Sequence, residues 1–163
     1  MPLPLAESQN ERGPDQPGAG QRNSLAASSA PMPSTRAVNP WTWQDAYGFS
    51  QGVEIHGGSR WLVCAGQTSV DAQGNPMHPG DMAAQLQQAF NNLEAVLKRA
   101  DLTLGDVVRL NYYTTDVAAY LKVAGDVMHR FPIDRPPPAG SLLGVAALFH
   151  PDILIEIEAS ACG

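Results

Sequence analysis

The stretch ILIEIEASA, residues 153–161, constrains the fold of this chain more than any other part of the sequence. Its side chains alternate between apolar and polar, and successive side chains of a β-strand point to opposite faces of a sheet. One face receives Ile153, Ile155, Ile157 and Ala159, and the other receives Leu154, Glu156, Glu158 and Ser160. The pattern predicts a strand with one face packed on a core and the other face carrying two carboxylates.

Two stretches have the spacing of amphipathic helices that would cover the apolar face. The first begins at Asp81 and ends near Ala100. Its apolar residues recur at steps of three or four positions: Met82, Leu86, Phe90, Leu93 and Leu97. The second has the same spacing at Val117, Leu121, Ala124, Met128 and Phe131. We expect both helices to pack on the isoleucine side of the sheet.

Other stretches are typical of strands. The run SQGVEIH, the turn Gly57-Gly58-Ser59 and the run RWLVCAG predict a hairpin. In DVVRLNYYTTD, alternation puts Val108, Leu110 and Tyr112 on one face, and Arg109, Asn111, Tyr113 and Thr115 on the other. The prolines of PPPAG, residues 136–140, brace the entry into a strand over SLLGVAAL. The order ββαβαββ predicts an α+β fold, a two-layer sandwich with both helices on one face.

The folded domain is expected to cover residues 39–163. Residues 1–38 are rich in Pro, Ser, Gly, Gln and Ala and contain no aromatic residue, which is typical of a disordered tail. The composition changes at Asn39, where Trp41 and Trp43 follow closely. We interpret these tryptophans as anchors against the core or against a neighbouring subunit.

Composition excludes several classes of function. A formal net charge of −6, with scattered Lys and Arg, argues against a nucleic-acid partner. No apolar run is long enough to cross a membrane, and the proline-broken N-terminus does not resemble a secretory signal. With only Cys64 and Cys162, we expect reduced, buried thiols and a cytoplasmic location. The four histidines have no metal-ligand spacing, so no metal site is expected.

The polar face of the predicted sheet has three possible explanations. It is a solvated surface, an oligomer interface, or a cleft in which one carboxylate carries a proton. The strand SLLGVAAL is apolar on both faces and therefore needs a partner on both faces. This favours an oligomer over a solvated surface.

Three long runs resemble the RidA family, also called YjgF/YER057c/UK114. They are FSQGVEIHGGSRWLVCAGQTSVDAQGN, QLQQAFNNLEAVLKRADLTLGDVVRLNYYTTDV and LLGVAALFHPDILIEIEASA, within residues 47–161. The resemblance implies a chorismate-mutase-like fold of the bacillus type, assembled as a homotrimer with clefts between subunits. It also implies hydrolysis of enamines and imines, a deaminase reaction, without a metal or organic cofactor.

Site residues carry over from the family by position. Glu156 matches the acid that places the attacking water, and Gly66, in CAGQ, matches a main-chain contact to ligand. Gly140 stands where the active deaminases have the arginine that pairs with the substrate carboxylate. Phe49 stands in place of a tyrosine. The other expected ligand-binding positions are Tyr113, Ala124, Ser141 and Leu142.

Two functions follow from these substitutions. One is a hydrolase of an enamine, imine or related amine other than the usual 2-iminoacids, with Glu156 as the catalytic residue. The alternative is a non-catalytic trimer that binds a small metabolite, because glycine and phenylalanine make the cleft less charged. A ribonuclease, a reading attached to some relatives, is disfavoured by the acidic balance. If the rest of the cleft is intact, Gly140→Arg is expected to restore some iminoacid hydrolysis.

Overall fold

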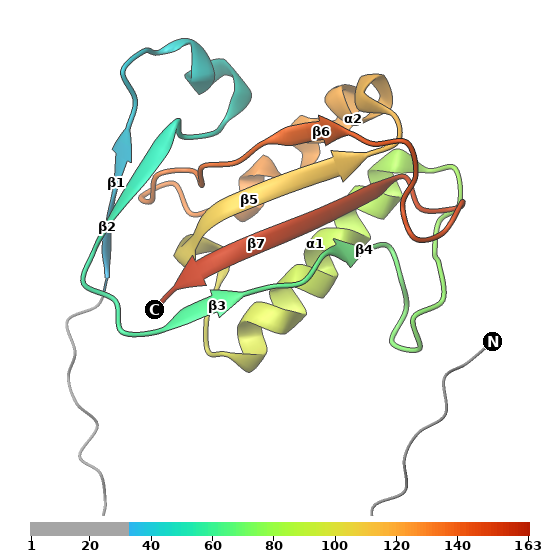
Figure 1. Cartoon of the computed structure of the whole chain (residues 1–163), viewed down its shortest axis with the longest axis horizontal. Coiled ribbons are helices and arrows are strands. Elements are labelled where there is room, and N and C mark those ends of the chain that lie inside the picture. The colour runs from blue at the N-terminus through green and yellow to red at the C-terminus, as the bar shows by residue number, and fades with distance from the viewer. Residues whose placement is uncertain (1–32) are drawn as a thin grey trace, which may run out of the picture.

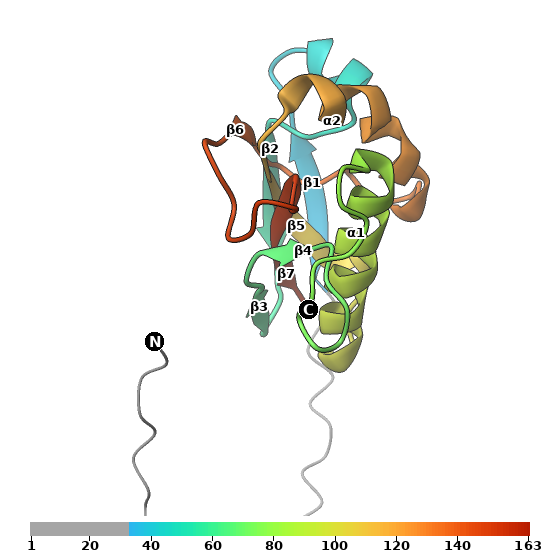
Figure 2. The ribbon, with the colours of Figure 1, turned by 90° about the vertical axis from the view of Figure 1, so that its right-hand side faces the viewer.

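The computed structural model describes residues 33–163, which form a sheet layer and a helix layer (Figures 1 and 2). The strands are β1 (Ser34–Val38), β2 (Gly52–His56), β3 (Trp61–Val63), β4 (Gln67–Thr68), β5 (Val107–Thr114), β6 (Leu142–Gly144) and β7 (Ile155–Cys162). The α-helices are α1 (Met82–Arg99) and α2 (Val117–Val123). Three 3₁₀ helices connect them: η1 (Trp43–Tyr47), η2 (Leu104–Asp106) and η3 (Ala124–Arg130).

The main sheet has the strand order β3-β7-β5-β6, and β4 also pairs with β7. The pairs β5–β7 and β3–β7 are antiparallel, whereas β5–β6 is parallel. Figure 2 shows α1 and α2 on the same side of this sheet. The predicted α+β class, with both helices on one face, is confirmed.

Strand β7 has the predicted alternation. Ile153, which precedes it, and Ile155, Ile157 and Ala159 are buried against the helix layer. Glu156 and Glu158 are half-buried on the opposite, outer face of the sheet. The outer face is turned toward the viewer in Figure 1.

Helix α1 supplies most of the core from the helix layer. Asp81 caps its N-terminus by accepting a hydrogen bond from the backbone N–H of Ala84 at 3.0 Å. The helix ends at Arg99, before Asp101 adopts a left-handed φ of 55°. All five predicted core positions on this helix are buried: Met82, Leu86, Phe90, Leu93 and Leu97.

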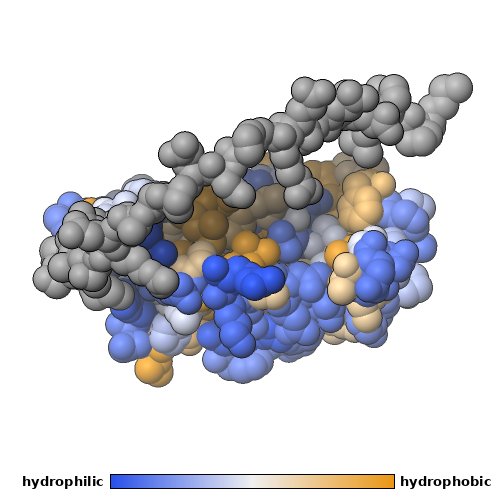
Figure 3. All heavy atoms as spheres, turned by 90° about the horizontal axis from the view of Figure 1, so that it is seen from below, coloured by the Kyte–Doolittle hydropathy of each residue, from blue (hydrophilic) through white to orange (hydrophobic). Residues whose placement is uncertain are grey.

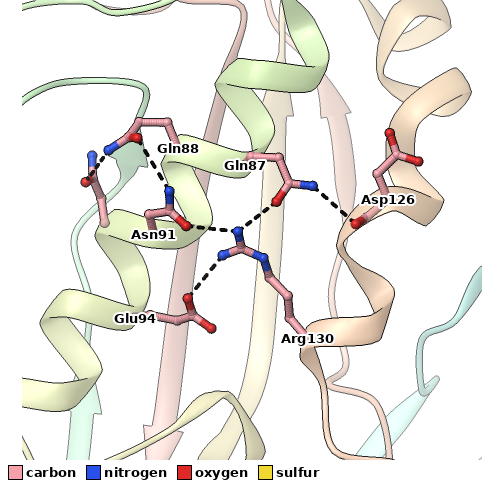
Figure 4. A network of polar contacts seen from close by, with 7 residues as sticks. Gln87, Gln88, Asn91, Glu94, Asp126 and Arg130 are labelled. Carbon is pink, nitrogen blue, oxygen red and sulfur yellow. Dashed lines mark hydrogen bonds and ion pairs between the residues drawn. The ribbon is translucent and has the colours of Figure 1, made fainter.

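Arg130, at the end of η3, joins the 3₁₀ segment to α1 (Figure 4). Its guanidinium donates to Glu94 Oε2 at 3.1 Å, to Gln87 Oε1 at 2.7 Å and to Asn91 Oδ1 at 2.9 Å. It also lies over the ring of Phe90, 5.8 Å from the centroid. This contact holds η3 on the helix layer and supports the chain that leads to the proline brace.

Strand β5 differs from the simple alternation at its start. The register with β7 shifts between Val107 and Arg109, which marks a β-bulge. Val107 consequently packs in the core cluster with Leu110, whereas Val108, at the bulge, is buried but lies outside that cluster. Beyond the bulge the predicted alternation holds, with Leu110 and Tyr112 on the core side.

The predicted hairpin between SQGVEIH and RWLVCAG is wrong. Strand β2 pairs with β1 in a separate two-stranded ribbon, and β3 pairs with β7 in the main sheet. Gly57 and Gly58, with φ of 72° and 84°, turn the chain from the ribbon into the sheet. Strand β1 lies inside the segment assigned to the tail, so ordered structure begins before residue 39. The rest of that assignment, residues 1–32, lies outside the described residues.

The strand predicted over SLLGVAAL is shorter than expected, because β6 covers only Leu142–Gly144. Leu142 and Leu143 are 38% and 42% exposed in the single chain. Viewed from below, hydrophilic residues cover much of the visible surface, and separate hydrophobic patches interrupt them (Figure 3). Within residues 33–163, no helix is long and apolar enough to cross a membrane.

Candidate functional site

The outer face of β5 and β7 carries a hydrogen-bonded polar cluster. Glu158 Oε1 accepts hydrogen bonds from Asn111 Nδ2 at 2.9 Å and from Tyr113 Oη at 2.8 Å. The bonds from Asn111 and then Tyr113 hold the pKa of Glu158 below its ordinary value. The same bond to Glu158 raises the pKa of Tyr113, so its hydroxyl stays protonated at neutral pH. Tyr113 is thus held on β5 as a donor, with its hydroxyl directed at β7.

Glu156 lies two residues before Glu158, next to strand β4. Its Cα partners are Tyr113 on β5 and Thr68 on β4. A Cβ placed on Gly66 would lie 1.7 Å from Glu156 Oε1, so the carboxylate occupies the space that a side chain at residue 66 would fill. No described residue donates a hydrogen bond to this carboxylate. Glu156 and Gly66 therefore lie in contact, and the carboxylate is available to bind water.

The proline brace is held between β5 and Ser50. Ser50 Oγ donates to the carbonyl of Pro137 at 2.6 Å, and its N–H donates to the carbonyl of Pro138 at 3.2 Å. On the other side, the N–H of Leu110 donates to the carbonyl of Ala139 at 2.9 Å. The brace leads the chain into β6 along a path hydrogen-bonded on both sides.

Residue 140 lies so close to the backbone of β5 that only glycine fits there. A Cβ at this position would lie 1.8 Å from the carbonyl oxygen of Leu110, which is a backbone atom of β5 and moves only if the strand moves. A side chain at residue 140 therefore requires a shift of the brace or of the strand. The expectation that Gly140→Arg restores a guanidinium in an otherwise intact cleft is not compatible with this backbone.

The remaining predicted residues lie near β6 or in the helix layer. Phe49 packs edge-on against Trp43, with the ring centroids 5.7 Å apart. Ser141 is exposed and donates its N–H to Asn111 Oδ1 at 3.2 Å. Ala124, at the start of η3, packs against the core from the helix side and does not meet Glu156. Trp41 and Trp43 are 63% and 57% exposed, so neither is an anchor against the core of its own chain.

Six of the eight predicted site residues fall into two groups on opposite sides of β5, while Tyr113 lies on β5 itself and Ala124 in the helix layer. Glu156 and Gly66 form the first group, at β7 and the segment before β4. Phe49, Gly140, Ser141 and Leu142 form the second, along β6 and the brace. Glu156 and Leu143 are both Cα partners of Tyr113, so β6 and β7 lie two strand spacings apart there, about 10 Å. One chain does not close a cleft around both groups.

A small hollow on the outer face includes residues that were given no role from the sequence. Its volume is about 160 Å³. It is lined by Val63, Cys64, Arg109, Asn111, Glu158, Ala159 and Ser160. The alternation placed Arg109, Asn111 and Glu158 on this face, but the register that pairs Asn111 with Glu158 depends on the bulge at Val108. Burial raises the pKa of the Cys64 thiol, which agrees with the expected buried, structural cysteine.

A larger groove of about 410 Å³ lies elsewhere, between the end of η3 and the brace. Met128, Phe131 and Ile133 are among its lining residues, and it contains none of the predicted site residues. Within the described part of the chain, no group of three or more His, Cys, Asp or Glu side chains is placed to hold a metal ion.

Comparison with known proteins places these features in a family context. Residues 43–162 match the sequence profile of the family described as Endoribonuclease L-PSP. The chain is 32% identical over 110 residues to the 2-iminobutanoate/2-iminopropanoate deaminase of Dermatophagoides farinae. That match covers 68% of this chain and 81% of the relative.

Solved structures agree with the sequence match. YyfB of Yersinia pestis, a Rid-family protein of unknown function, is 38% identical with a TM-score of 0.70. The match covers 79% of this chain and 98% of YyfB. Rv2704 of Mycobacterium tuberculosis, a member of the YjgF/YER057c/UK114 family, is 31% identical with a TM-score of 0.54. This second match covers 80% of this chain and 100% of Rv2704.

Proposed function

This chain belongs to the Endoribonuclease L-PSP family, which includes the Rid and YjgF proteins, and from that premise we propose that it hydrolyses an imine or enamine to a carbonyl compound and ammonia. Relatives named 2-iminobutanoate/2-iminopropanoate deaminase support this class of reaction. The acidic net charge of −6 supports a small-molecule substrate over RNA.

The observation that carries the proposal is the position of Glu156. Its carboxylate is half-buried, lies against Gly66 and accepts no hydrogen bond from any described residue. A carboxylate with free acceptor positions in a partly enclosed place is suited to bind and orient a water molecule. Asn111 and Tyr113, on the same face, are already used to hold Glu158.

The proposed chemistry needs only water and a base. Glu156 accepts a proton from water while the water oxygen bonds to the imine carbon, and the C=N π electrons move to nitrogen. Glu156 returns this proton to that nitrogen, which gives a carbinolamine with an NH₂ group. The hydroxyl proton is then transferred through Glu156 to the same nitrogen, and the C–N bond breaks as the C=O bond forms. Ammonia leaves, and Glu156 returns to its ionised state. No electron transfer takes place, so neither a redox partner nor a cofactor is part of the proposal.

Gly140 bears on the identity of the substrate. In the active deaminases that this chain resembles, an arginine at this position holds the substrate carboxylate, and here the Leu110 carbonyl leaves no room for a side chain. A two-pronged Arg–carboxylate pair contributes about 2–3 kcal/mol, so its loss weakens binding roughly 30- to 150-fold. We therefore expect the substrate to be an imine without a carboxylate at the reacting carbon.

The proposal includes a homotrimer with a cleft at each seam. The separation of the two groups of site residues supports it, because a cleft that uses both groups needs a second copy. The exposed apolar side chains along β6 and beyond, among them Leu142, Leu143 and Phe149, support burial against a neighbour. The exposed Trp41 and Trp43 agree with the interpretation that they anchor against another subunit.

A non-catalytic trimer that binds an apolar metabolite is the second candidate. The second group of site residues favours it, because Phe49 and Leu142, with Trp43 packed against Phe49, present aromatic and aliphatic surface without a charged side chain. It predicts ligand binding that does not depend on Glu156.

The test compares two freshly generated imines of matched size, 2-iminopropanoate and the imine of acetone, which has a methyl group in place of the carboxylate. We expect ammonia release to be accelerated for the acetone imine and to fall by about 100-fold or more in Glu156→Gln. Glu54→Gln, which removes an exposed carboxylate of the β1–β2 ribbon, is the control for charge. Equal rates in Glu156→Gln and wild type would overturn the catalytic proposal and favour the binding module.

A further inference from the structure

Tyr113 faces two carboxylates of β7 and donates a hydrogen bond to one of them. Its Cα partner across the sheet is Glu156, whereas Glu158, the next residue of β7 on the same face, is the Cα partner of Asn111. The hydroxyl of Tyr113 donates to Glu158 Oε1 at 2.8 Å, and no described residue donates to Glu156. Tyr113 therefore bonds to its diagonal neighbour rather than to the residue directly opposite.

Both carboxylates belong to side chains that an aromatic residue at position 113 can contact. Directly opposed residues of an antiparallel pair have Cβ atoms about 4.5–5.5 Å apart, and diagonal pairs about 7–8 Å, which long side chains still span. The Glu156 side chain has rotatable bonds, and it lies beside Gly66 without a hydrogen bond from a described residue. The bond to Glu158 is thus the contact that directs the Tyr113 hydroxyl away from Glu156.

Glu158 is itself held in position to keep this hydroxyl. Asn111 Nδ2 also donates to Glu158 Oε1, at 2.9 Å, and Asn111 Oδ1 accepts from the N–H of Ser141 at 3.2 Å. The bonds from Asn111 and Tyr113 hold the pKa of Glu158 below its ordinary value, so this carboxylate is ionised at neutral pH. All these bonds lie within one chain, so the arrangement does not depend on whether a neighbouring subunit covers this face of the sheet.

We propose that Glu158 is a positioning residue for the imine reaction, and that it acts by holding the Tyr113 hydroxyl away from Glu156. Glu156 then stays beside Gly66, with its oxygens open to the attacking water. Without an acceptor at residue 158, the Tyr113 hydroxyl donates to Glu156. That bond makes Glu156 a weaker base and occupies an oxygen that the water needs. The inference rests on the proposed function of Glu156.

The first experiment measures ammonia release from the acetone imine in variants of residue 158. Glu158→Met removes the acceptor with little change in side-chain length, and it is expected to lower the rate by about 10-fold or more. Glu158→Gln keeps an oxygen that can accept from Asn111 and Tyr113, so it is expected to recover most of the rate lost in Glu158→Met. Glu54→Met, on the exposed β1–β2 ribbon, is the matched control and is expected to release ammonia as fast as the wild type does.

A second substitution separates this role from a purely structural one. Tyr113→Phe, added to Glu158→Met, removes the hydroxyl that would otherwise bond to Glu156. The double variant is expected to release ammonia at least about 3-fold faster than Glu158→Met alone. If Glu158 only stabilised the sheet, a second loss in the same cluster would lower the rate further. Glu158→Ala takes the place of Glu158→Met in both comparisons if the methionine variant does not fold.

A crystal structure of Glu158→Met provides a readout that needs no turnover. We expect the Tyr113 hydroxyl to lie within hydrogen-bond distance of a Glu156 oxygen in this variant. The inference is overturned if the hydroxyl stays away from Glu156, if folded Glu158→Met keeps the wild-type rate, or if Tyr113→Phe does not raise the rate of Glu158→Met. Equal rates in Glu156→Gln and wild type overturn the proposed function instead, and the crystal structure still decides where the Tyr113 hydroxyl goes.

Discussion

Each of the two groups of site residues contains one glycine that is tightly packed, Gly66 in the first and Gly140 in the second. The two glycines pack against different kinds of neighbour. Gly66 lies against a side chain, the carboxylate of Glu156, which has rotatable bonds. Gly140 lies against a backbone carbonyl, that of Leu110, which belongs to the central strand pair of the sheet. A Cβ at residue 66 therefore displaces the Glu156 carboxylate, whereas a Cβ at residue 140 displaces the backbone of β5 or of the brace.

Gly66→Ala is expected to impair function more than stability. The added methyl group would displace the Glu156 carboxylate, whose Oε1 lies 1.7 Å from the ideal Cβ position. Misplacement of a catalytic group by about 1 Å lowers rates by roughly 100-fold, so ammonia release should fall by at least 10-fold. Steady-state rates and thermal melting of the same preparation check this. A variant with wild-type activity and wild-type stability would show that Glu156 is not held in its working position by Gly66.

Gly140→Ala is expected to destabilise the fold by about 1–3 kcal/mol, because overpacking here meets backbone. Gly125→Ala is the matched control, since nothing lies within 4 Å of its ideal Cβ position and its φ is not in the left-handed region. The control is expected to be neutral or stabilising by up to about 1 kcal/mol. Urea unfolding of both variants measures the difference. Equal free energies of unfolding would mean that residue 140 is glycine for a reason other than space.

At the scale of secondary-structure elements, the sequence predicts what depends on local periodicity. The alternation of β7 and the buried face of α1 were both readable, because each pattern is complete within one segment. The partner of β2 was not readable, because it depends on β1 in a segment whose composition suggests a tail. The bulge at Val108 was also hidden, because neither neighbouring valine differs in chemistry from the other.

In the candidate site too, features within one segment were predicted, and features that depend on contacts between distant segments were not. Glu156 and Gly66 were predicted as site residues with separate roles, and the structure places them in contact. The lack of space for a side chain at Gly140 was missed. It results from the packing of the brace against Leu110, about 30 residues away in the chain, and neither local sequence indicates that contact. The hydrogen bonds from Asn111 and Tyr113 to Glu158 depend on the β5–β7 register in the same way.

The contact between η3 and α1 gives a prediction at this scale. Arg130 is only 16% exposed and donates to three side chains of α1, so Arg130→Met should lower the free energy of unfolding by about 1–3 kcal/mol. Arg36→Met removes an arginine whose side chain is 65% exposed, and it should cost no more than about 1 kcal/mol. Chemical denaturation of the two variants checks the contrast. A loss for Arg130→Met no larger than that for Arg36→Met would mean that packing alone holds η3.

At the scale of the whole molecule, the single chain has an incomplete site and exposed apolar residues beside it. The first group of site residues lies by β4 and β7, and the second lies by β6 and the brace. Both facts have one explanation if the β6 side of one copy packs near the β4–β7 side of the next. A ring of such head-to-tail contacts closes into a cyclic oligomer, and a trimer is the smallest such ring beyond a dimer.

Mixed oligomers test this arrangement directly. Glu156→Gln damages the first group, and Leu142→Trp blocks the second, so each variant alone is expected to be inactive. In co-expressed mixtures, a seam that takes Glu156 from the Leu142→Trp chain and Leu142 from the Glu156→Gln chain contains no substitution. Random mixing gives about one intact seam in four, so ammonia release should return to roughly a quarter of the wild-type rate per chain. If both groups served a cleft within one chain, every cleft would keep one substitution, and the mixture would stay as inactive as its components.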